Sequence, residues 1–243
     1  MPLQEGSRYS ISQVSEFDFA PGELLAELGY RYLEAPLPLP SAAQLHSAPQ
    51  LGELRAQMLR RLPRVPLTSM GARRALYVIP LLFAALDQAG FRMYIDLPVA
   101  GGRLWGTVDY LLRGARDVVV AIAENAHTET GFSQLAAQMV AVSEQAPQQL
   151  RPIHAQRARK AERAERARSE SFEPKRSVCS QIQVFGAVTN GALWRFAILE
   201  RTSRTFTQDT STFHLPGDLE HLLSLIVALT GVVAQKKSGS APT

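Results

Sequence analysis

The sequence of 243 residues is poor in cysteine and lysine, and it has no long apolar run. Its single cysteine, Cys179, excludes an intrachain disulfide and a zinc site built from several cysteines. No run approaches the roughly 20 apolar residues that a membrane span requires, and the N-terminus lacks the pattern of a secretory signal. We therefore expect a soluble, cytoplasmic protein without a membrane partner.

Lysine is confined to the second half of the chain. The four lysines are Lys160, Lys175, Lys236 and Lys237. The formal net charge of +4 is concentrated in residues 151–176, which hold nine basic and four acidic side chains, so the rest of the chain is close to neutral. The composition of this segment favours an exposed, charged helical insertion with almost no apolar face.

The insertion offers candidate contacts for nucleic acid, since each phosphate that a cation neutralises adds affinity. These candidates are Arg157, Arg159, Lys160, Arg163, Arg166 and Arg168. Glutamates interleave with them, however, and a solvated helix or a surface for a protein partner fits the same pattern.

The remaining pattern predicts one domain over residues 1–235, with a flexible tail at 236–243. The hydrophobic content of 46% is ample for a buried core. Apolar spacing predicts helices over 21–29, 51–62, 72–89, 131–142 and 219–233, and strands over 91–99, 104–112, 118–123 and 204–215. Pro80 should kink its helix or start a new one. Leu59, Phe83, Trp105 and Trp194 are expected in the core; the alternative for the two tryptophans is that they stack nucleic-acid bases.

Residues 103–138 read as a strand, a glycine-containing turn, a second strand and a helix. This stretch resembles the core of the PD-(D/E)XK, or restriction-endonuclease-like, nucleases. In these enzymes the first strand presents an aspartate, and the second presents an acid and a lysine two residues apart. The resemblance implies an α/β fold with a mixed central sheet flanked by helices. It also implies that Asp109 is the first acid and that Gln134 belongs to the Gly-x-x-Gln that opens the helix.

A second string supports the same family. Asn190-Gly191 between two apolar runs predicts a tight hairpin, because both turn residues tolerate positive φ. Residues 186–196 read Gly-x-Val-Thr-Asn-Gly-x-x-Trp-x-Phe. They resemble a hairpin downstream of the nuclease core in uncharacterised bacterial proteins of the PD-(D/E)XK superfamily.

The sequence departs from the family where the chemistry is carried. Ile122-Ala123-Glu124 or Ala121-Ile122-Ala123 falls on the acid-x-Lys triplet, and no lysine lies near this hairpin. Many relatives carry Arg-Arg-Glu before the apolar helix, whereas this chain has Arg73-Arg74-Ala75. A nuclease Mg²⁺ needs several oxygen ligands, and the lysine orients or activates the attacking water.

Three hypotheses follow. The first is an inactive nuclease-like domain that binds nucleic acid or another partner and needs no cofactor, with Asp109, Glu124 and Gln134 as vestigial site residues. The second is an active Mg²⁺-dependent nuclease in which Asp109 and Glu124 hold the metal and His127 or Gln134 supplies a third group. The third is a structural or regulatory domain that binds a protein through residues 151–176.

Overall fold

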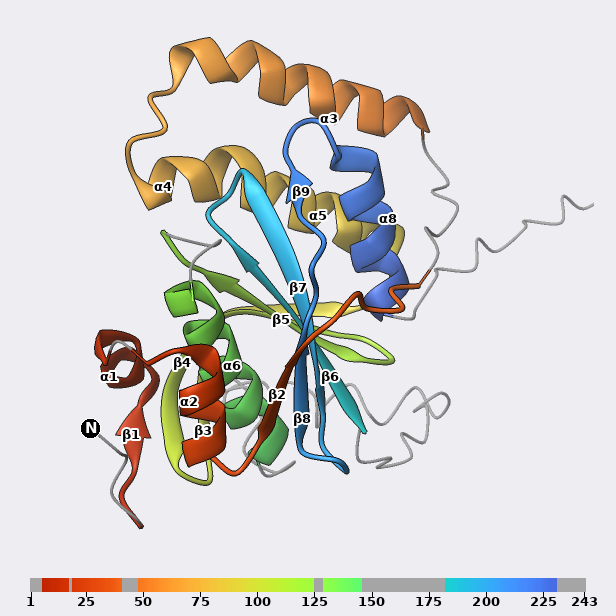
Figure 1. Ribbon diagram of the computed structural model, residues 1–243. Helices are drawn as coiled ribbons and strands as arrows, with labels where there is room; N and C mark the ends of the chain where they lie inside the picture. The colour runs from red at the N-terminus through yellow and green to blue at the C-terminus, as the bar shows by residue number, and fades with distance from the viewer. Residues whose placement is uncertain (1–5, 18, 41–47, 125–128, 146–181, 231–243) are drawn as a thin grey trace, which may run out of the picture.

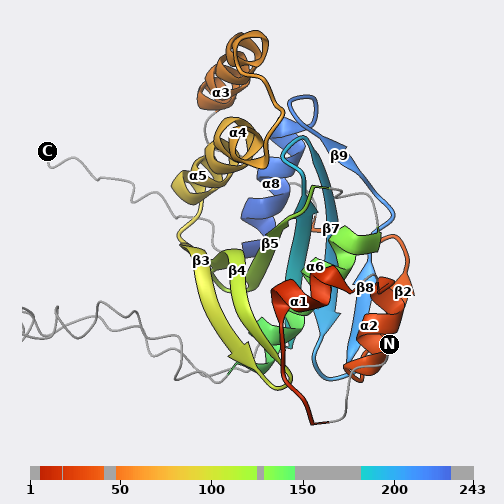
Figure 2. The ribbon, with the colours of Figure 1, turned by 90° about the vertical axis from the view of Figure 1, so that its left-hand side faces the viewer.

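The computed structural model describes residues 6–17, 19–40, 48–124, 129–145 and 182–230. Within these ranges a nine-stranded mixed sheet is flanked by helices on both faces (Figures 1 and 2). The chain is thus a mixed α/β protein, as the sequence predicts. No described helix is both long enough and apolar enough to cross a membrane. Outside the described ranges lie the insertion at 151–176, the tail at 236–243, His127, Cys179 and all four lysines.

The sheet combines antiparallel hairpins with parallel pairs. Its strands are β1 (Tyr9–Ser10), β2 (Arg31–Glu34), β3 (Arg92–Gly101), β4 (Leu104–Arg113), β5 (Asp117–Ile122), β6 (Gln183–Thr189), β7 (Leu193–Glu200), β8 (Thr205–Gln208) and β9 (Phe213–His214). Their order is β1-β4-β5-β6-β7-β8-β2, with β3 beside β4 and β9 beside β7. The pairs β1–β4, β5–β6 and β2–β8 are parallel, and the other pairs are antiparallel.

Two helical layers bury two separate cores. One face, called here the α6 face, is covered by α1 (Ile11–Glu16), α2 (Pro21–Glu27) and α6 (Glu129–Glu144). The other, the α5 face, is covered by α3 (Ala48–Arg61), η1 (Leu62–Arg64), α4 (Met70–Arg73), η2 (Arg74–Val78), α5 (Ile79–Gln88) and α8 (Leu219–Thr230). In Figure 1, α3 is the outermost element on the α5 face.

Several predicted elements have a clear local cause. Pro80 lies in the first turn of α5, where its missing N–H is harmless, so the long predicted helix starts afresh there after the π-helical turn η2. Gly191 has a φ of 97°, and the Asn190 side chain accepts the backbone N–H groups of Ala192 and Leu193. The hairpin prediction for β6 and β7 is therefore confirmed.

The structure also has elements ahead of residue 21, where the sequence predicted none, and other expectations were wrong. The N-terminal segment contains β1 and α1, and the capping box of α1 joins Ser10 to Gln13 through reciprocal side-chain to backbone hydrogen bonds. The predicted strand over 204–215 is divided into β8 and β9. Trp194 is buried as expected, but Leu59, Phe83 and Trp105 are each about half exposed, at 50%, 47% and 49%.

Candidate functional site

Among the residues that the structure describes, one edge of β4 is left unpaired between β1 and β5, and this gap at residues 106–109 is called here the fork. β3 pairs along the whole of β4, so β5 and β1 share the opposite edge of β4. β5 pairs with residues 110–113 and β1 with residues 104–105, and between them residues 106–109 have no strand partner on that edge within the described ranges. Gly106 lies in this gap with a φ of 147°, and a Cβ there would meet Ile11 of α1 at 3.2 Å. The absence of a side chain at Gly106 therefore lets Ile11 of α1 pack directly against β4.

At Asp109 the alternation of side chains between the two faces of the sheet shifts by one residue in the β3–β4 hairpin. In β4, Val108 and Leu111 both face the α6 side although they are three residues apart. In β3, Tyr94 and Leu97 do the same. The ladder pairs Ile95 with Tyr110 and Leu97 with Val108, so Asp96 and Asp109 stand opposite each other as one additional residue in each strand. Asp96 has a φ of 49°, which is rare for a residue other than glycine.

The Asp109 carboxylate accepts N–H donors through one oxygen. Its Oδ2 accepts from the backbone N–H of Ile122 at 3.1 Å, from Nε2 of Gln138 at 2.9 Å and, more weakly, from Nε2 of Gln134 at 3.4 Å. The two glutamines are four residues apart and lie on the same side of α6. Gln134 Nε2 also donates to the carbonyl of Ile122 at 3.1 Å, so the end of β5, the helix and Asp109 form one network.

Arg74 faces the other carboxylate oxygen. Its Nη2 is 3.7 Å from Oδ1 of Asp109 and 3.6 Å from Oδ1 of Asp96, while its Nε donates to the hydroxyl of Tyr110 at 3.2 Å. The guanidinium also lies over the Tyr110 ring, 5.2 Å from its centroid. Burial alone lowers the pKa of Arg74, but the contact with Tyr110 and the charges of Asp109 and Asp96 outweigh burial and raise that pKa. Arg74 therefore stays cationic at neutral and mildly alkaline pH.

The structure brings together some of the expected residues. Asp109 and Gln134 are in contact, as described above. The residue of β5 beside Asp109 is Ile122, whose side chain packs on the α5-face core. Glu124 is exposed in the turn two residues later and is not among the hydrogen-bond partners of Asp109. Ala75, which aligns with the glutamate of the nucleases that the sequence resembles, is also exposed.

Three residues of this cluster were not predicted from the sequence as site residues: Arg74, Asp96 and Gln138. Gln138 had a usable signal, since it follows Gln134 by one helical turn. Arg74 lies directly before Ala75, but only folding brings it to Asp109. Asp96 carried no signal, because its place opposite Asp109 depends on the ladder register.

These residues fit a divalent metal poorly. The carboxylates of this cluster are those of Asp96 and Asp109, and Nη2 of Arg74 lies within 3.7 Å of both. Within the described ranges no group of three or more histidine, cysteine, aspartate and glutamate side chains is placed to hold a metal ion. Hydrogen-bond donors, which cannot ligate a cation, occupy Oδ2 of Asp109.

An open cavity of about 490 Å³ adjoins Asp109 in the fork. It is lined by Ser10, Ile11, Ser12, Trp105, Gly106, Thr107, Asp109, Gln134 and Gln138. Trp105 contributes a half-exposed indole, and the other side chains are mostly polar. Gln138 is only 2% exposed, and its Oε1 has no hydrogen-bond partner among the described residues.

A second polar surface lies on α3 and η1. A cavity of about 410 Å³ there is lined by Gln57, Arg60, Arg61 and Arg64. Glu53 pairs with Arg60 at 2.9 Å, but both side chains are more than half exposed, so the pair contributes little stability. Figure 2 shows the end of α3, the start of α4, α1 and β4 on the side of the molecule that faces the viewer.

Comparison with protein-family models, with curated proteins and with solved structures finds no match for this chain.

Proposed function

We propose that this chain is a restriction-endonuclease-like domain that binds nucleic acid without hydrolysing it. The observation that carries the proposal is the environment of Asp109. One oxygen of its carboxylate accepts three N–H groups and the other faces Arg74, so an internal cation stands where a catalytic metal would be needed. The antiparallel β4–β5 hairpin leading into α6 supports the family resemblance, because that is the arrangement which the resemblance implies.

The absence of hydrolysis follows from what hydrolysis requires. Mg²⁺ is held by several oxygen ligands, and a cation beside it orients or activates water. Position 122 is an isoleucine, position 75 is an alanine, and the described ranges contain no lysine. One such change could be compensated by a neighbour. Three changes at one site favour a domain that has kept the scaffold without the reaction.

The binding function is supported by the arginines of α3 and η1. Arg60, Arg61 and Arg64 line one cavity. The end of α3, which carries Arg60 and Arg61, lies on the same side of the molecule as α1 and β4 (Figure 2). Guanidinium groups suit phosphate, since their planar donors match its oxygens and their charge displaces counterions. The interleaved charges of residues 151–176 lie outside the described ranges, so the proposal rests on α3 and η1.

The test is fluorescence anisotropy of labelled single- and double-stranded DNA and RNA, with EDTA or with Mn²⁺, followed by gels of the same samples. We expect binding that does not depend on the metal, weakens as salt rises and leaves the strands intact. Arg60→Glu/Arg64→Glu should weaken binding about tenfold or more, because phosphate contacts are lost and repulsion is added. Arg31→Glu/Arg201→Glu, at exposed arginines of β2 and the β7–β8 turn, is the matched control.

Two results would contradict the proposal in different ways. Metal-dependent cleavage that disappears in Asp109→Ala would establish the active nuclease. Absence of binding to all four nucleic acids at low salt would remove the nucleic-acid partner and favour the protein-binding hypothesis.

A further inference from the structure

The two tryptophans of the chain lie in opposite environments. Trp194 is fully buried, and its indole N–H donates to the carbonyl of Gly191 at 3.1 Å. Trp105 is 49% exposed at the edge of the fork, although its neighbour Leu104 is buried. A large ring that remains half exposed beside a cavity offers a flat apolar surface to a ligand.

The cavity beside Trp105 has the size and lining of a small-ligand site. Its volume of about 490 Å³ lies within the range common for such sites, roughly 300–1,000 Å³. The indole forms one part of the wall, and hydroxyls of Ser12 and Thr107 form another. The remaining polar wall consists of Asp109 and the two glutamines of α6.

Asp109 and Gln138, which both line the cavity, each have an oxygen left to accept a donor. Oδ1 of Asp109 faces Arg74 at 3.7 Å, which is too long for a hydrogen bond, so it can accept another donor. Oε1 of Gln138 is an acceptor without a partner among the described residues, and Gln138 is only 2% exposed. A buried acceptor without a partner is costly, so a ligand that donates N–H groups into this wall would be stabilised.

We propose that the cavity takes one unpaired nucleobase that carries an exocyclic amino group. The base stacks on Trp105 and donates its amino group to Asp109. This inference rests on the proposed function, because the arginines of α3 and η1 hold the rest of the strand. A base in a duplex has both faces stacked and its donor edge paired, so only a single-stranded base can enter. Thymine and uracil carry a carbonyl oxygen at the position where cytosine carries its amino group, and this oxygen is repelled by the carboxylate, so they bind more weakly.

The experiment uses the full chain and two oligonucleotides, (dC)12 and (dT)12, in EDTA. Tryptophan emission and the anisotropy of the labelled strand are followed in the same titrations. We expect (dC)12 to quench part of the emission, with the same midpoint as the anisotropy. The quenching should vanish in Trp105→Phe, because the remaining Trp194 is buried.

Variants separate stacking from recognition of the amino group. Trp105→Ala should weaken (dC)12 binding about fivefold or more, as the loss of one stacked base does. Asp109→Asn should narrow the difference between (dC)12 and (dT)12. Ile95→Ala removes a side chain of similar exposure, 48%, from the neighbouring strand and outside the cavity, so it should leave both affinities unchanged.

The possible results distinguish a failure of the base site from a failure of the proposed nucleic-acid binding. Anisotropy that reports binding, with no change in tryptophan emission or with equal affinities for (dC)12 and (dT)12, overturns the base site and leaves the nucleic-acid function standing. No binding of either strand overturns both. Metal-dependent cleavage with preserved quenching overturns only the claim that the domain is inactive.

Discussion

Two aspartates of the β4–β5 hairpin, Asp117 and Asp109, pair with arginines in two different ways. Arg113 and Asp117 form a bidentate pair, with Nε–Oδ1 at 3.0 Å and Nη2–Oδ2 at 2.8 Å, and their side chains are 16% and 11% exposed. Arg74 approaches Asp109 only to 3.7 Å, and those side chains are 29% and 21% exposed. In the Arg113–Asp117 pair, called here the closed pair, the guanidinium binds both carboxylate oxygens. In the Arg74–Asp109 pair, called here the loose pair, Oδ1 of Asp109 can still accept a hydrogen bond from a ligand.

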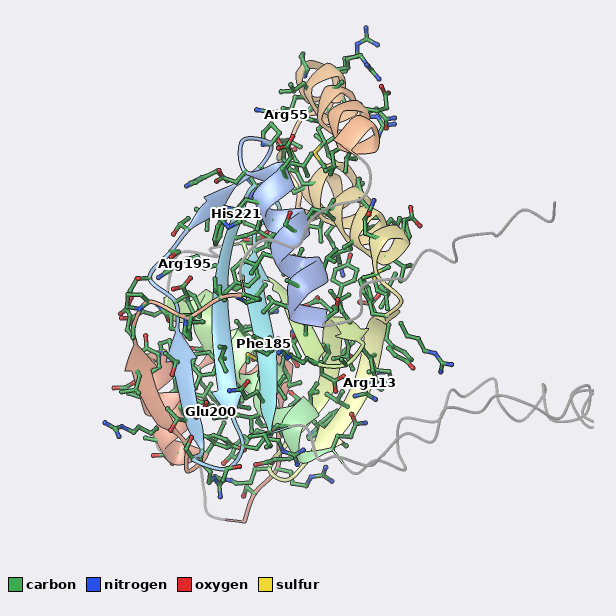
Figure 3. The ribbon with its side chains drawn as sticks, turned by 90° about the vertical axis from the view of Figure 1, so that its right-hand side faces the viewer. Arg55, Arg113, Phe185, Arg195, Glu200 and His221 are labelled. Atoms are coloured by element: carbon green, nitrogen blue, oxygen red, sulfur yellow. The ribbon has the colours of Figure 1, made fainter. Side chains whose placement is uncertain are left out.

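The origin of the difference is the backbone. Arg113 and Asp117 face each other in the ladder of one tight hairpin, so local register holds them together. Arg74 reaches Asp109 from a π-helical turn on another element, and Asp109 is itself the additional residue in its strand. Figure 3 shows Arg113 well below α3, the helix that carries Arg55. We infer that the closed pair stabilises the fold and the loose pair serves the site.

The largest expected effect is on the closed pair. Asp117→Ala should lower the free energy of unfolding by about 3 kcal/mol, because it leaves the guanidinium of Arg113 mostly buried without its counter-ion. Urea denaturation followed by circular dichroism measures this loss. Asp87→Ala, at an exposed aspartate of α5, is the control and should change stability by less than about 0.5 kcal/mol. A loss for Asp117→Ala no larger than that of the control would break the comparison.

An intermediate effect is expected at Asp109. Asp109→Ala removes the acceptor of the Ile122 N–H and of the buried Gln138 amide, which should cost about 1–2 kcal/mol. The open cavity lets water replace part of what is lost, so the cost stays below that of Asp117→Ala. Denaturation of Glu124→Ala supplies the reference for an exposed acid in the same region. If Asp109→Ala were as damaging as Asp117→Ala, the Asp109 network would be primarily structural.

Arg74→Met is expected to have the smallest effect on stability and to create a binding site for Mn²⁺. Removing a partly exposed arginine with long ion-pair distances should cost less than about 1 kcal/mol. It also leaves Asp96 and Asp109 facing each other without a cation, so calorimetry should detect weak Mn²⁺ binding that the wild-type protein lacks. Adding Asp96→Asn should abolish that binding. Equal Mn²⁺ heats for wild type and Arg74→Met would show that the guanidinium does not occupy the place of a metal.

Local signals in the sequence predicted much of the fold. Asn190-Gly191 marks the β6–β7 hairpin, and Pro80 marks the start of α5, since turn chemistry and the missing proline N–H act within a few residues. Exposure was harder to predict. Leu59, Phe83 and Trp105 have the spacing of core residues, but what covers a position depends on elements distant in sequence.

Only part of the site was predicted, because some of its residues come from elements distant in sequence. The family resemblance points to Asp109 and Gln134, and the structure places them in contact. It does not place Glu124 among the partners of Asp109. Arg74 and Asp96 arrive from other elements, through a helical turn and a strand register that no local pattern encodes.

The paired irregularity of the hairpin has a consequence for how its sequence can change. If Asp96 and Asp109 were both deleted, the inward and outward alternation of β3 and β4 would become continuous, and their remaining partners would keep their register. Deleting either one alone would shift one strand by a residue, so the side chains of half of that strand would move to the opposite face of the sheet. The two aspartates are thus surplus to the architecture and tied to each other, as a matched insertion would be.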